Sequence, residues 1–268
     1  MWKVRLDGTD EYLPPFALGT WDIRDRKRMV QTIRLALEMG INHIDTAEMY
    51  PGAEETIAEA LRGVDRQGVF IVSKVLPYHA SYKGTKEALE KTLRRLNTDY
   101  VDAYLLHWWD GSYPLEETFR AFDELIDEGK MRYAGVSNFS RRELEEAVRI
   151  FSPRPIIFDQ VKYNLSDRRA EVDILPLCRK HGITMTAYSP LWQGRYPSPE
   201  KWRVLEMVGR KYGATPFQVA LNFLLTRNRD IIAIFKTENP DHLRENLDSL
   251  NFELSPEDVE LIDRTFPA

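Results

Sequence analysis

A repeated alternation of short apolar segments and longer amphipathic segments most constrains the fold of this 268-residue chain. Eight apolar segments have the length of strands, and most are continuous apolar runs with no regular polar alternation. Continuous runs of this kind are typical of parallel strands that are covered on both faces. The predicted strands are Phe16–Thr20, Asn42–Thr46, Val69–Lys74, Tyr100–His107, Arg132–Ser137, Ile156–Val161, Thr184–Ser189 and Asp230–Lys236.

The segments between these strands carry apolar residues at helical spacing. The helices expected within the repeat are Arg26–Glu38, Glu54–Leu61, Thr85–Leu96, Leu115–Asp127, Arg141–Ile150, Arg169–His181, Pro199–Tyr212 and one that opens at Pro240. Two further helices, Thr215–Leu225 and Ser255–Asp263, are expected outside the repeat. The second of these has a clear start signal, because Ser255 is followed by a proline and two acidic residues.

Eight strand–helix units predict an α/β fold, a single-domain (β/α)8 TIM barrel that spans residues 1–268. Such barrels take about 250 residues, and no low-complexity linker interrupts the series. A doubly wound open sheet is the alternative, but no G-x-G-x-x-G motif follows an early strand. Barrel active sites lie at the C-terminal ends of the strands, so we look for chemistry there.

Composition excludes several classes of partner. The net charge is −5 and no long run of like charges occurs, so nucleic-acid binding has no electrostatic support. No apolar stretch reaches the roughly 18–20 residues of a membrane helix, and no secretory leader is recognisable. The only cysteine, Cys178, can form no internal disulfide and suits a reducing compartment. We expect a cytoplasmic protein without nucleic-acid or membrane partners, and without a metal.

Titratable side chains end three consecutive predicted strands. Asp45 lies at the end of the second strand, Tyr50 follows five residues later, Lys74 ends the third strand and His107 ends the fourth. Each alone has an ordinary structural interpretation, as a helix cap, a packing aromatic, a solvated cation or a core histidine. Because the C-terminal ends of neighbouring barrel strands share one rim, the combination predicts a common site.

The chemistry of these four side chains suits proton donation. Tyrosine has a pKa of about 10, and a nearby lysine ammonium is expected to lower it towards the range of an efficient acid. Asp45 would fix the lysine, and a neutral His107 would orient a carbonyl oxygen. Tyr50 could then protonate that oxygen while a hydride reaches the carbon, and such acid catalysis contributes about 10²–10⁴-fold.

These segments resemble the aldo-keto reductase family over nearly the whole chain. Asp45–Tyr50 resembles the D-x-A-x-x-Y segment of the family, Val72–Lys74 its lysine strand and Leu105–His107 its histidine strand. The short loops resemble prokaryotic members. The resemblance implies an oxidoreductase that reduces aldehydes or ketones to alcohols with NADP(H), or with NAD(H) as the alternative cofactor, and with Tyr50 as the general acid.

The resemblance also implies a set of cofactor contacts. Gly135–Phe139 is similar to the G-V-S-N-F segment whose serine and asparagine hold the nicotinamide carboxamide, and Tyr188 to the tyrosine that stacks on the ring. Loop capping and rim packing are the ordinary alternatives. The implied contacts are Gly19, Thr20, Trp21, Asp45, Ser137, Asn138, Gln160, Tyr188, Ser189, Leu191, Gln193, Lys236, Thr237, His242, Arg244, Glu245 and Asn246.

The segment from Ile234 to Asn246 resembles the phosphate and adenine site of the family. A lysine at a strand end and the start of a helix both suit a phosphate, so Lys236 and Thr237 favour NADPH. Where the family often has an arginine, six residues after the lysine, this chain has His242. A histidine lacks the guanidinium fork, so the NADPH preference is expected to weaken unless Arg244 compensates.

Other departures from the family pattern concern the substrate side. Pro51–Ala53 stands where the family usually has glycine after the tyrosine, and Phe235 stands in place of a proline. The loop after Leu191 is short, which implies an open cleft. The residues expected to contact the substrate are Trp21, Met49, Tyr50, His107, Trp108 and Trp192.

Two other functions remain open at this stage. A relative of this fold could serve as a nucleotide-sensing regulatory subunit with vestigial reductase activity, although the chain shows no extra N-terminal interaction segment. A barrel isomerase or aldolase could use Lys74 to form a Schiff base. The expected partner is a small-molecule carbonyl substrate, and the expected state is a monomer or a weak homo-oligomer.

Overall fold

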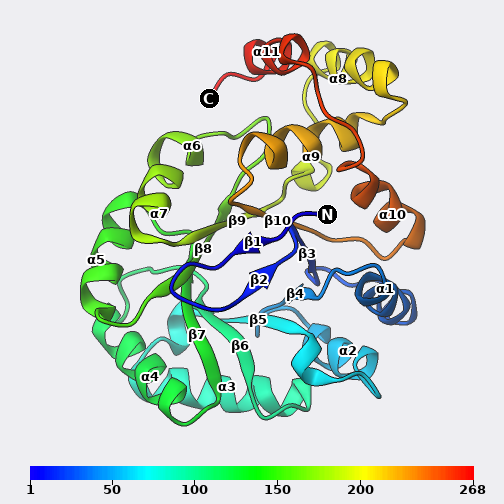
Figure 1. Ribbon diagram of the computed structural model, residues 1–268. Helices are drawn as coiled ribbons and strands as arrows, with labels where there is room; N and C mark the ends of the chain where they lie inside the picture. The colour runs from blue at the N-terminus through cyan, green and yellow to red at the C-terminus, as the bar shows by residue number, and fades with distance from the viewer.

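The computed structural model describes residues 1–268 and contains a closed barrel of eight parallel strands in the order β10-β3-β4-β5-β6-β7-β8-β9 (Figure 1). The prediction of a (β/α)8 barrel is confirmed, and no strand boundary differs by more than two residues. The barrel strands are β3 (Phe16–Gly19), β4 (His43–Asp45), β5 (Phe70–Val75), β6 (Val101–Leu106), β7 (Met131–Ser137), β8 (Ile156–Lys162), β9 (Thr184–Tyr188) and β10 (Ile232–Phe235).

Burial on both faces explains the continuous apolar runs. Every residue of β5 and of β6 is buried, because one face of each strand lies inside the barrel and the other lies under helices. Lys74 in the middle of this buried set is therefore an exception that calls for a polar partner.

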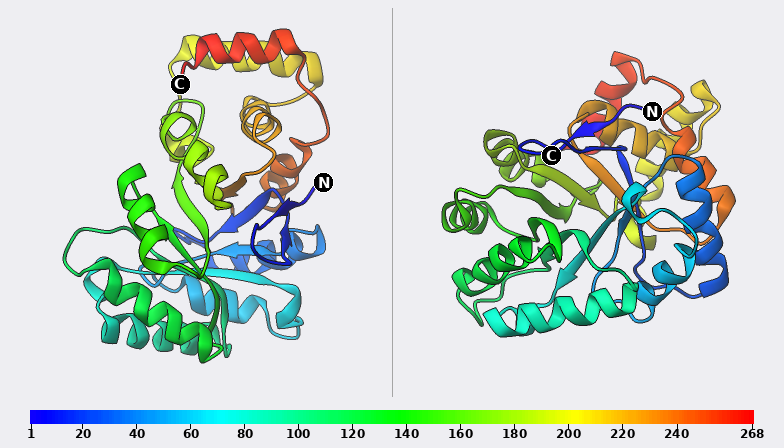
Figure 2. Two further views of the ribbon diagram at one scale, coloured as in Figure 1. Left: turned by 60° about the vertical axis from the view of Figure 1, so that its left-hand side comes forward. Right: turned by 60° about the horizontal axis from the view of Figure 1, so that its bottom comes forward.

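Helices surround the barrel and follow the strands in turn (Figures 1 and 2). The α-helices are α1 (Arg26–Glu38), α2 (Ala53–Ala60), α3 (Tyr82–Leu96), α4 (Leu115–Asp127), α5 (Arg141–Phe151), α6 (Ala170–Asp173), α7 (Leu175–His181), α8 (Pro199–Tyr212), α9 (Pro216–Arg227), α10 (Pro240–Asp248) and α11 (Pro256–Thr265). Short 3-10 turns are η1 (Arg66–Gly68), η2 (Pro77–His79) and η3 (Trp192–Gly194). None of the helices is long and apolar enough to cross a membrane.

The helix predicted over Arg169–His181 is divided into α6 and α7. The two parts meet at Ile174, and Pro176 lies in the first turn of α7. Proline has no backbone N–H for a continuing helix, so the break lies where the sequence places this residue.

The assignment of helices to the repeat was wrong at one point. The structure places α9 against β10, and it places α8 and α11 together, farther from the barrel (Figure 2). The sequence pattern instead predicts α8 within the repeat and α9 outside it. Residues Val219–Leu225 of α9 are all buried, because this helix lies between the barrel and other helices. A helix that is buried on all sides has no amphipathic pattern to reveal its position.

An N-terminal hairpin, not predicted from the sequence, closes one end of the barrel. Strands β1 (Val4–Arg5) and β2 (Tyr12–Leu13) pair antiparallel and cross the barrel opening (Figure 1). Leu6 and Leu13 are buried and pack with Phe70 and Phe158 of the barrel interior. With two residues each, these strands give no periodic signal. The closed N-terminal end leaves the opposite end for a binding site.

Candidate active site

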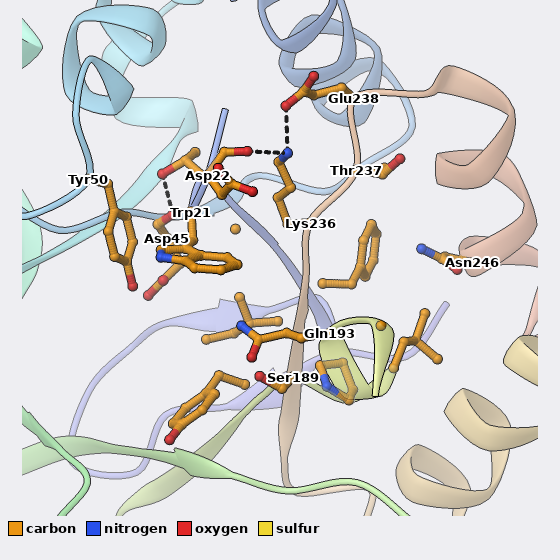
Figure 3. Close-up of a pocket in the computed structure, with 18 of the residues that line it drawn as sticks. Trp21, Asp22, Asp45, Tyr50, Ser189, Gln193, Lys236, Thr237, Glu238 and Asn246 are labelled. Carbon is orange, nitrogen blue, oxygen red and sulfur yellow. Dashed lines mark hydrogen bonds and ion pairs between the residues drawn. The ribbon is translucent and has the colours of Figure 1, made fainter. Parts of the chain in front are cut away.

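A cavity of about 940 Å³ opens at the C-terminal ends of the barrel strands (Figure 3). Its wall includes residues at the ends of β3, β4, β7, β8, β9 and β10. Clefts that bind small molecules measure roughly 300–1,000 Å³, and barrel active sites lie at this face. The cavity therefore lies where the strand ends were expected to carry chemistry.

Lys74 and Asp45 form a buried ion pair at the cavity floor. The Lys74 side chain is fully buried, and its Nζ donates to Asp45 Oδ1 at 2.7 Å and to the Thr46 carbonyl oxygen at 2.7 Å. Burial lowers the pKa of Lys74, while Asp45 opposes that change. Asp45 Oδ2 accepts from Gln160 Nε2 at 2.7 Å, so both carboxylate oxygens are held.

Tyr50 and His107 lie next to this pair. Lys74 Nζ is 5.4 Å from the centroid of the Tyr50 ring, and the Tyr50 and His107 rings are in edge contact at 5.9 Å. The four residues predicted from three strand ends are thus brought together. Asp45, Tyr50 and His107 line the cavity itself, whereas Lys74 lies behind Asp45.

The unusual residues after Tyr50 form two consecutive turns. The Tyr50 N–H bonds to the Ala47 carbonyl oxygen at 3.0 Å, and the Ala53 N–H bonds to the Tyr50 carbonyl oxygen at 3.1 Å. Gly52 between them has a φ of 70°, a left-handed conformation that glycine adopts without strain. The turns lead into α2 and keep the tyrosine at the cavity, so the departure from the family pattern is accommodated locally.

The buried carboxylate of Glu54 anchors the start of α2. Glu54 accepts from Ser73 Oγ at 2.9 Å and pairs with Arg95. Ser73 directly precedes Lys74 on β5, so this contact joins the loop of Tyr50 to the lysine strand. The first acidic residue after the Pro51–Ala53 segment therefore has structural partners on β5 and α3.

The pKa of Tyr50 differs in direction from the prediction. Burial raises the pKa of Tyr50 well above its ordinary value, and the negative charge of Asp45 raises it further. The expected lowering of the Tyr50 pKa by Lys74 was wrong. The ammonium of Lys74 pairs with Asp45 and donates no hydrogen bond to the phenol. The phenol therefore keeps its proton throughout the neutral pH range.

His107 is held neutral. Burial lowers the pKa of His107 to about 3, and the Lys74 charge adds to the effect. The ring also contacts Trp108 at 5.2 Å. A neutral imidazole at the cavity wall agrees with the charge state expected from the sequence.

Polar groups predicted to meet a nicotinamide lie beside these residues. Ser137 Oγ donates to the Gln160 carbonyl oxygen at 2.8 Å, and Asn138 Nδ2 donates to the His107 carbonyl oxygen at 3.0 Å. Tyr188 Oη donates to Asn138 Oδ1 at 2.8 Å. Ser189 lines the cavity, and its Oγ is buried without a hydrogen-bond partner.

Left-handed backbone is concentrated at the cavity. Of the six non-glycine residues with positive φ, four line it: Asp22, Asn138, Ser189 and Gln193. Such residues are uncommon and tend to occur at functional sites, where the surrounding structure holds them. No sequence pattern had indicated this clustering.

The predicted phosphate end of the cavity has a different charge balance from the one expected. Lys236 Nζ donates to the Asp22 carbonyl oxygen at 2.7 Å and to Glu238 Oε1 at 2.5 Å (Figure 3). Thr237, His242, Glu245 and Asn246 also line the cavity. The lysine is thus present as predicted, but it already has an acidic partner.

Two predicted contact residues are not brought to the cavity. Arg244 points to Asp241, with Nη1 at 3.3 Å from Oδ1, and does not line the cavity. Trp192 is buried behind the wall, where Nε1 donates to Ser166 Oγ at 3.0 Å and the ring packs against Trp202. In this arrangement Arg244 does not replace the missing arginine, and Trp192 forms no wall for a substrate.

The remaining expected wall residues lie at the cavity. Trp21, Met49 and Trp108 line it, and Trp21 and Met49 are 49% and 42% exposed. Their exposure agrees with the open cleft that the short loop after Leu191 implied.

Several residues of the wall were not named individually as contacts from the sequence. They are Asp22, Arg24, Arg28, Pro190, Gly194, Tyr196, Phe217, Ile234, Phe235, Glu238 and Asn239. Glu238 could have been noticed, because it is an acidic residue two positions after the lysine that ends the last strand. Phe217 could not, because α9 was placed outside the repeat.

Comparison with known proteins finds a family model and similar reductases that match nearly the whole chain. A family model described as "Aldo/keto reductase family" matches residues 15–266. The methylglyoxal reductase YeaE of Escherichia coli is 39% identical over 97% of this chain and 93% of its own length. The glyoxal reductase of Bacillus subtilis is 34% identical over 94% of this chain and 88% of its own length.

Solved structures agree in fold. A thermostable aldo-keto reductase in complex with the inhibitor epalrestat superposes with a TM-score of 0.93 at 43% identity, covering 99% of this chain and all of that one. An aldo-keto reductase from Klebsiella pneumoniae in complex with NADPH superposes with a TM-score of 0.91 at 35% identity, covering 100% of this chain and 96% of that one.

Proposed function

The chain belongs to the aldo/keto reductase family, and on that premise we propose that it reduces small aldehydes and ketones with NADPH. Methylglyoxal and glyoxal are the proposed first substrates, because two relatives over nearly the whole chain are named for their reduction. The observation that carries the proposal is the buried Asp45–Lys74 pair beside Tyr50 and His107 at the floor of one cavity.

The donors and acceptors of the cavity wall fit a nicotinamide nucleotide. Ser137, Asn138 and Gln160 offer hydroxyl and amide groups that suit a carboxamide, and the Ser189 hydroxyl is buried without a partner. The ring of Tyr188 offers a flat face. At the other end of the cavity, the start of α10 and Lys236 suit a phosphate. When bound, the reduced nucleotide supplies the hydride.

Tyr50 is the proposed proton donor. As the carbonyl carbon accepts the hydride, the C=O π bond becomes a C–O single bond, and the oxygen takes the phenolic proton. The product is the alcohol, and the tyrosinate that remains recovers a proton from water. The Lys74 ammonium, 5.4 Å from the ring, pairs with Asp45 and so limits the repulsion between that carboxylate and the transient phenolate. The raised pKa of Tyr50 keeps the donor form populated at neutral pH.

His107 and the aromatic wall are proposed to position the substrate. A neutral imidazole can donate a hydrogen bond to the carbonyl oxygen without competing as an acid. Trp21, Met49 and Trp108 offer apolar contacts at an open mouth, which suits small carbonyl compounds of varied shape.

The Schiff-base alternative has no support from the geometry. Lys74 is fully buried, donates two hydrogen bonds at 2.7 Å and does not line the cavity. A lysine nucleophile needs a free, unprotonated amine that a carbonyl carbon can reach.

A panel of carbonyl compounds tests the proposal. Methylglyoxal, glyoxal and simple aromatic aldehydes are each incubated with the protein and NADPH or NADH, and loss of the reduced nicotinamide is followed. We expect consumption with methylglyoxal or glyoxal that depends on both protein and carbonyl. Nucleotide binding with no consumption across the panel would refute the reductase and favour a nucleotide-sensing subunit.

A further inference from the structure

Glu238 lies at the phosphate end of the cavity and forms an ion pair with Lys236. Glu238 Oε1 is 2.5 Å from Lys236 Nζ, and both side chains are largely buried, at 15% and 26% exposed. Figure 3 shows Lys236 between Glu238 and Asp22. The lysine that would meet a 2′-phosphate is therefore already neutralised by a carboxylate on the same loop.

The position of Glu238 is fixed from a second loop. Oε1 accepts the backbone N–H of Arg24 at 2.8 Å, and Oε2 accepts that of Asp25 at 2.9 Å. Burial alone would raise the pKa of Glu238, but the bonds from Lys236 and these two N–H groups hold that pKa below its usual value. The carboxylate is thus ionised at neutral pH and cannot swing away without breaking three hydrogen bonds.

The other cationic side chains of this wall also lie beside acidic side chains. Arg24 bonds to Asp22 at 3.0 Å, and Arg28 lies 3.6 Å from Asp25. His242 occupies the place where a guanidinium would add unpaired positive charge. The wall therefore presents little net positive charge to a doubly charged phosphate.

We infer that Glu238 determines cofactor choice, lowering the preference for a 2′-phosphorylated nucleotide and accepting the 2′-hydroxyl of NADH. A carboxylate has about four acceptor positions, and three are used in the structure. Acidic side chains that bind a ribose hydroxyl select NAD in other dinucleotide sites, for the same chemical reason. The inference rests on the proposed function and refines which nucleotide serves it.

The test is Glu238→Gln, which removes the charge and nearly keeps the shape. Dissociation constants for NADPH and NADH are measured by quenching of tryptophan fluorescence, because Trp21 and Trp108 line the cavity. One carboxylate a few ångströms from a doubly charged phosphate predicts roughly tenfold tighter NADPH binding in the variant. NADH binding should stay equal or weaken.

Asp248→Asn is the matched control. Asp248 is the last residue of α10, is exposed and does not line the cavity. It undergoes the same charge change, so a shift caused by general electrostatics would appear in both variants. We expect the NADPH-to-NADH affinity ratio of this control to stay within about twofold of wild type, since exposed charges are strongly screened.

The outcomes are separable. If wild type binds both nucleotides and Glu238→Gln leaves their affinity ratio unchanged, or Asp248→Asn shifts it equally, the role of Glu238 is refuted while the reductase stands. If wild type binds neither nucleotide, the proposed function itself fails. Should Glu238→Gln not fold, as judged by circular dichroism, Glu238→Ser removes the same charge and must show the same rise in the ratio.

Discussion

At the scale of residues, burial controls the charge states of the site more than neighbouring charges do. Tyr50 and His107 both border the cavity, and for each the main cause of the pKa change is removal from water. The directions are opposite in sign, because burial penalises the anionic phenolate and the cationic imidazolium. Both residues are thereby kept neutral, which suits the proposed roles of Tyr50 as proton donor and of His107 as hydrogen-bond donor to the substrate.

These charge states predict a flat pH profile for carbonyl reduction. With the pKa of His107 near 3 and that of Tyr50 raised, neither group changes charge as pH rises from about 5 to 9. We expect kcat/KM for methylglyoxal to vary less than about threefold over that range, measured at saturating NADPH. An acidic limb near pH 6.5 that disappears in His107→Gln would contradict the neutral imidazole.

Residue types and strand ends sufficed to name the four candidate catalytic residues, but not their energetics. Asp45, Lys74 and His107 end or nearly end apolar runs, which is visible in the sequence. The sign of the Tyr50 pKa change depends on how deeply the loop after β4 buries the phenol. It also depends on which group forms the ion pair with Lys74. Neither quantity is encoded in local spacing.

At the scale of elements, the two faces of strand β8 have different surroundings. One face lies toward the cavity and the other toward the surrounding helices. Gln160 lines the cavity, so the preceding residue, Asp159, points to the opposite side of the strand. Asp159 is fully buried, no side chain donates a hydrogen bond to its carboxylate, and the backbone N–H of Phe139 only partly offsets the effect of burial. Burial raises the pKa of Asp159 well above its usual value.

From the buried carboxyl of Asp159 we predict that Asp159→Asn is more stable than wild type, by an amount that depends on pH. The native state keeps the proton that the unfolded chain loses above about pH 4, so wild type loses stability as pH rises through and above that value. The amide does not ionise, so the variant should gain about 1–3 kcal/mol over wild type at pH 7, and less at pH 4. Thermal unfolding at both pH values measures it.

An exposed aspartate provides the control for that experiment. Asp99 is exposed on the turn after α3, so Asp99→Asn makes the same charge change at a site without burial. A stability difference for Asp159→Asn that is constant between pH 4 and pH 8 would show that the buried carboxyl does not titrate as the structure indicates.

The elements themselves were predictable wherever the periodic signal is local. All eight barrel strands were located, because continuous apolar runs reflect burial on both faces. The exchange of α8 and α9 was not foreseeable, because burial of α9 by other helices removes its amphipathic stripe. The hairpin of β1 and β2 is too short to carry a pattern.

At the scale of the whole molecule, closure of the barrel joins residues that are far apart in the sequence. Pairing of β10 with β3 brings the loop of Glu238 against the loop of Arg24 and Asp25. The fold class followed from the count of strand–helix units, but this contact depends on the closed circle of strands. The sequence therefore indicated Lys236 at the phosphate end without its acidic partner.

Because the barrel is closed at its N-terminal end, the large cavity opens at the C-terminal end. The proposed catalytic residues lie at the floor of this cavity. The most direct test is Tyr50→Phe, which removes only the phenolic hydroxyl. Turnover of methylglyoxal with NADPH and the dissociation constant for NADPH are measured for wild type and variant, with Tyr188→Phe as a control in the same cavity. We predict that Tyr50→Phe loses about 10²–10⁴-fold in kcat, that NADPH affinity changes little, and that Tyr188→Phe retains most turnover. Near-normal turnover in Tyr50→Phe would contradict the assignment of Tyr50 as the proton donor.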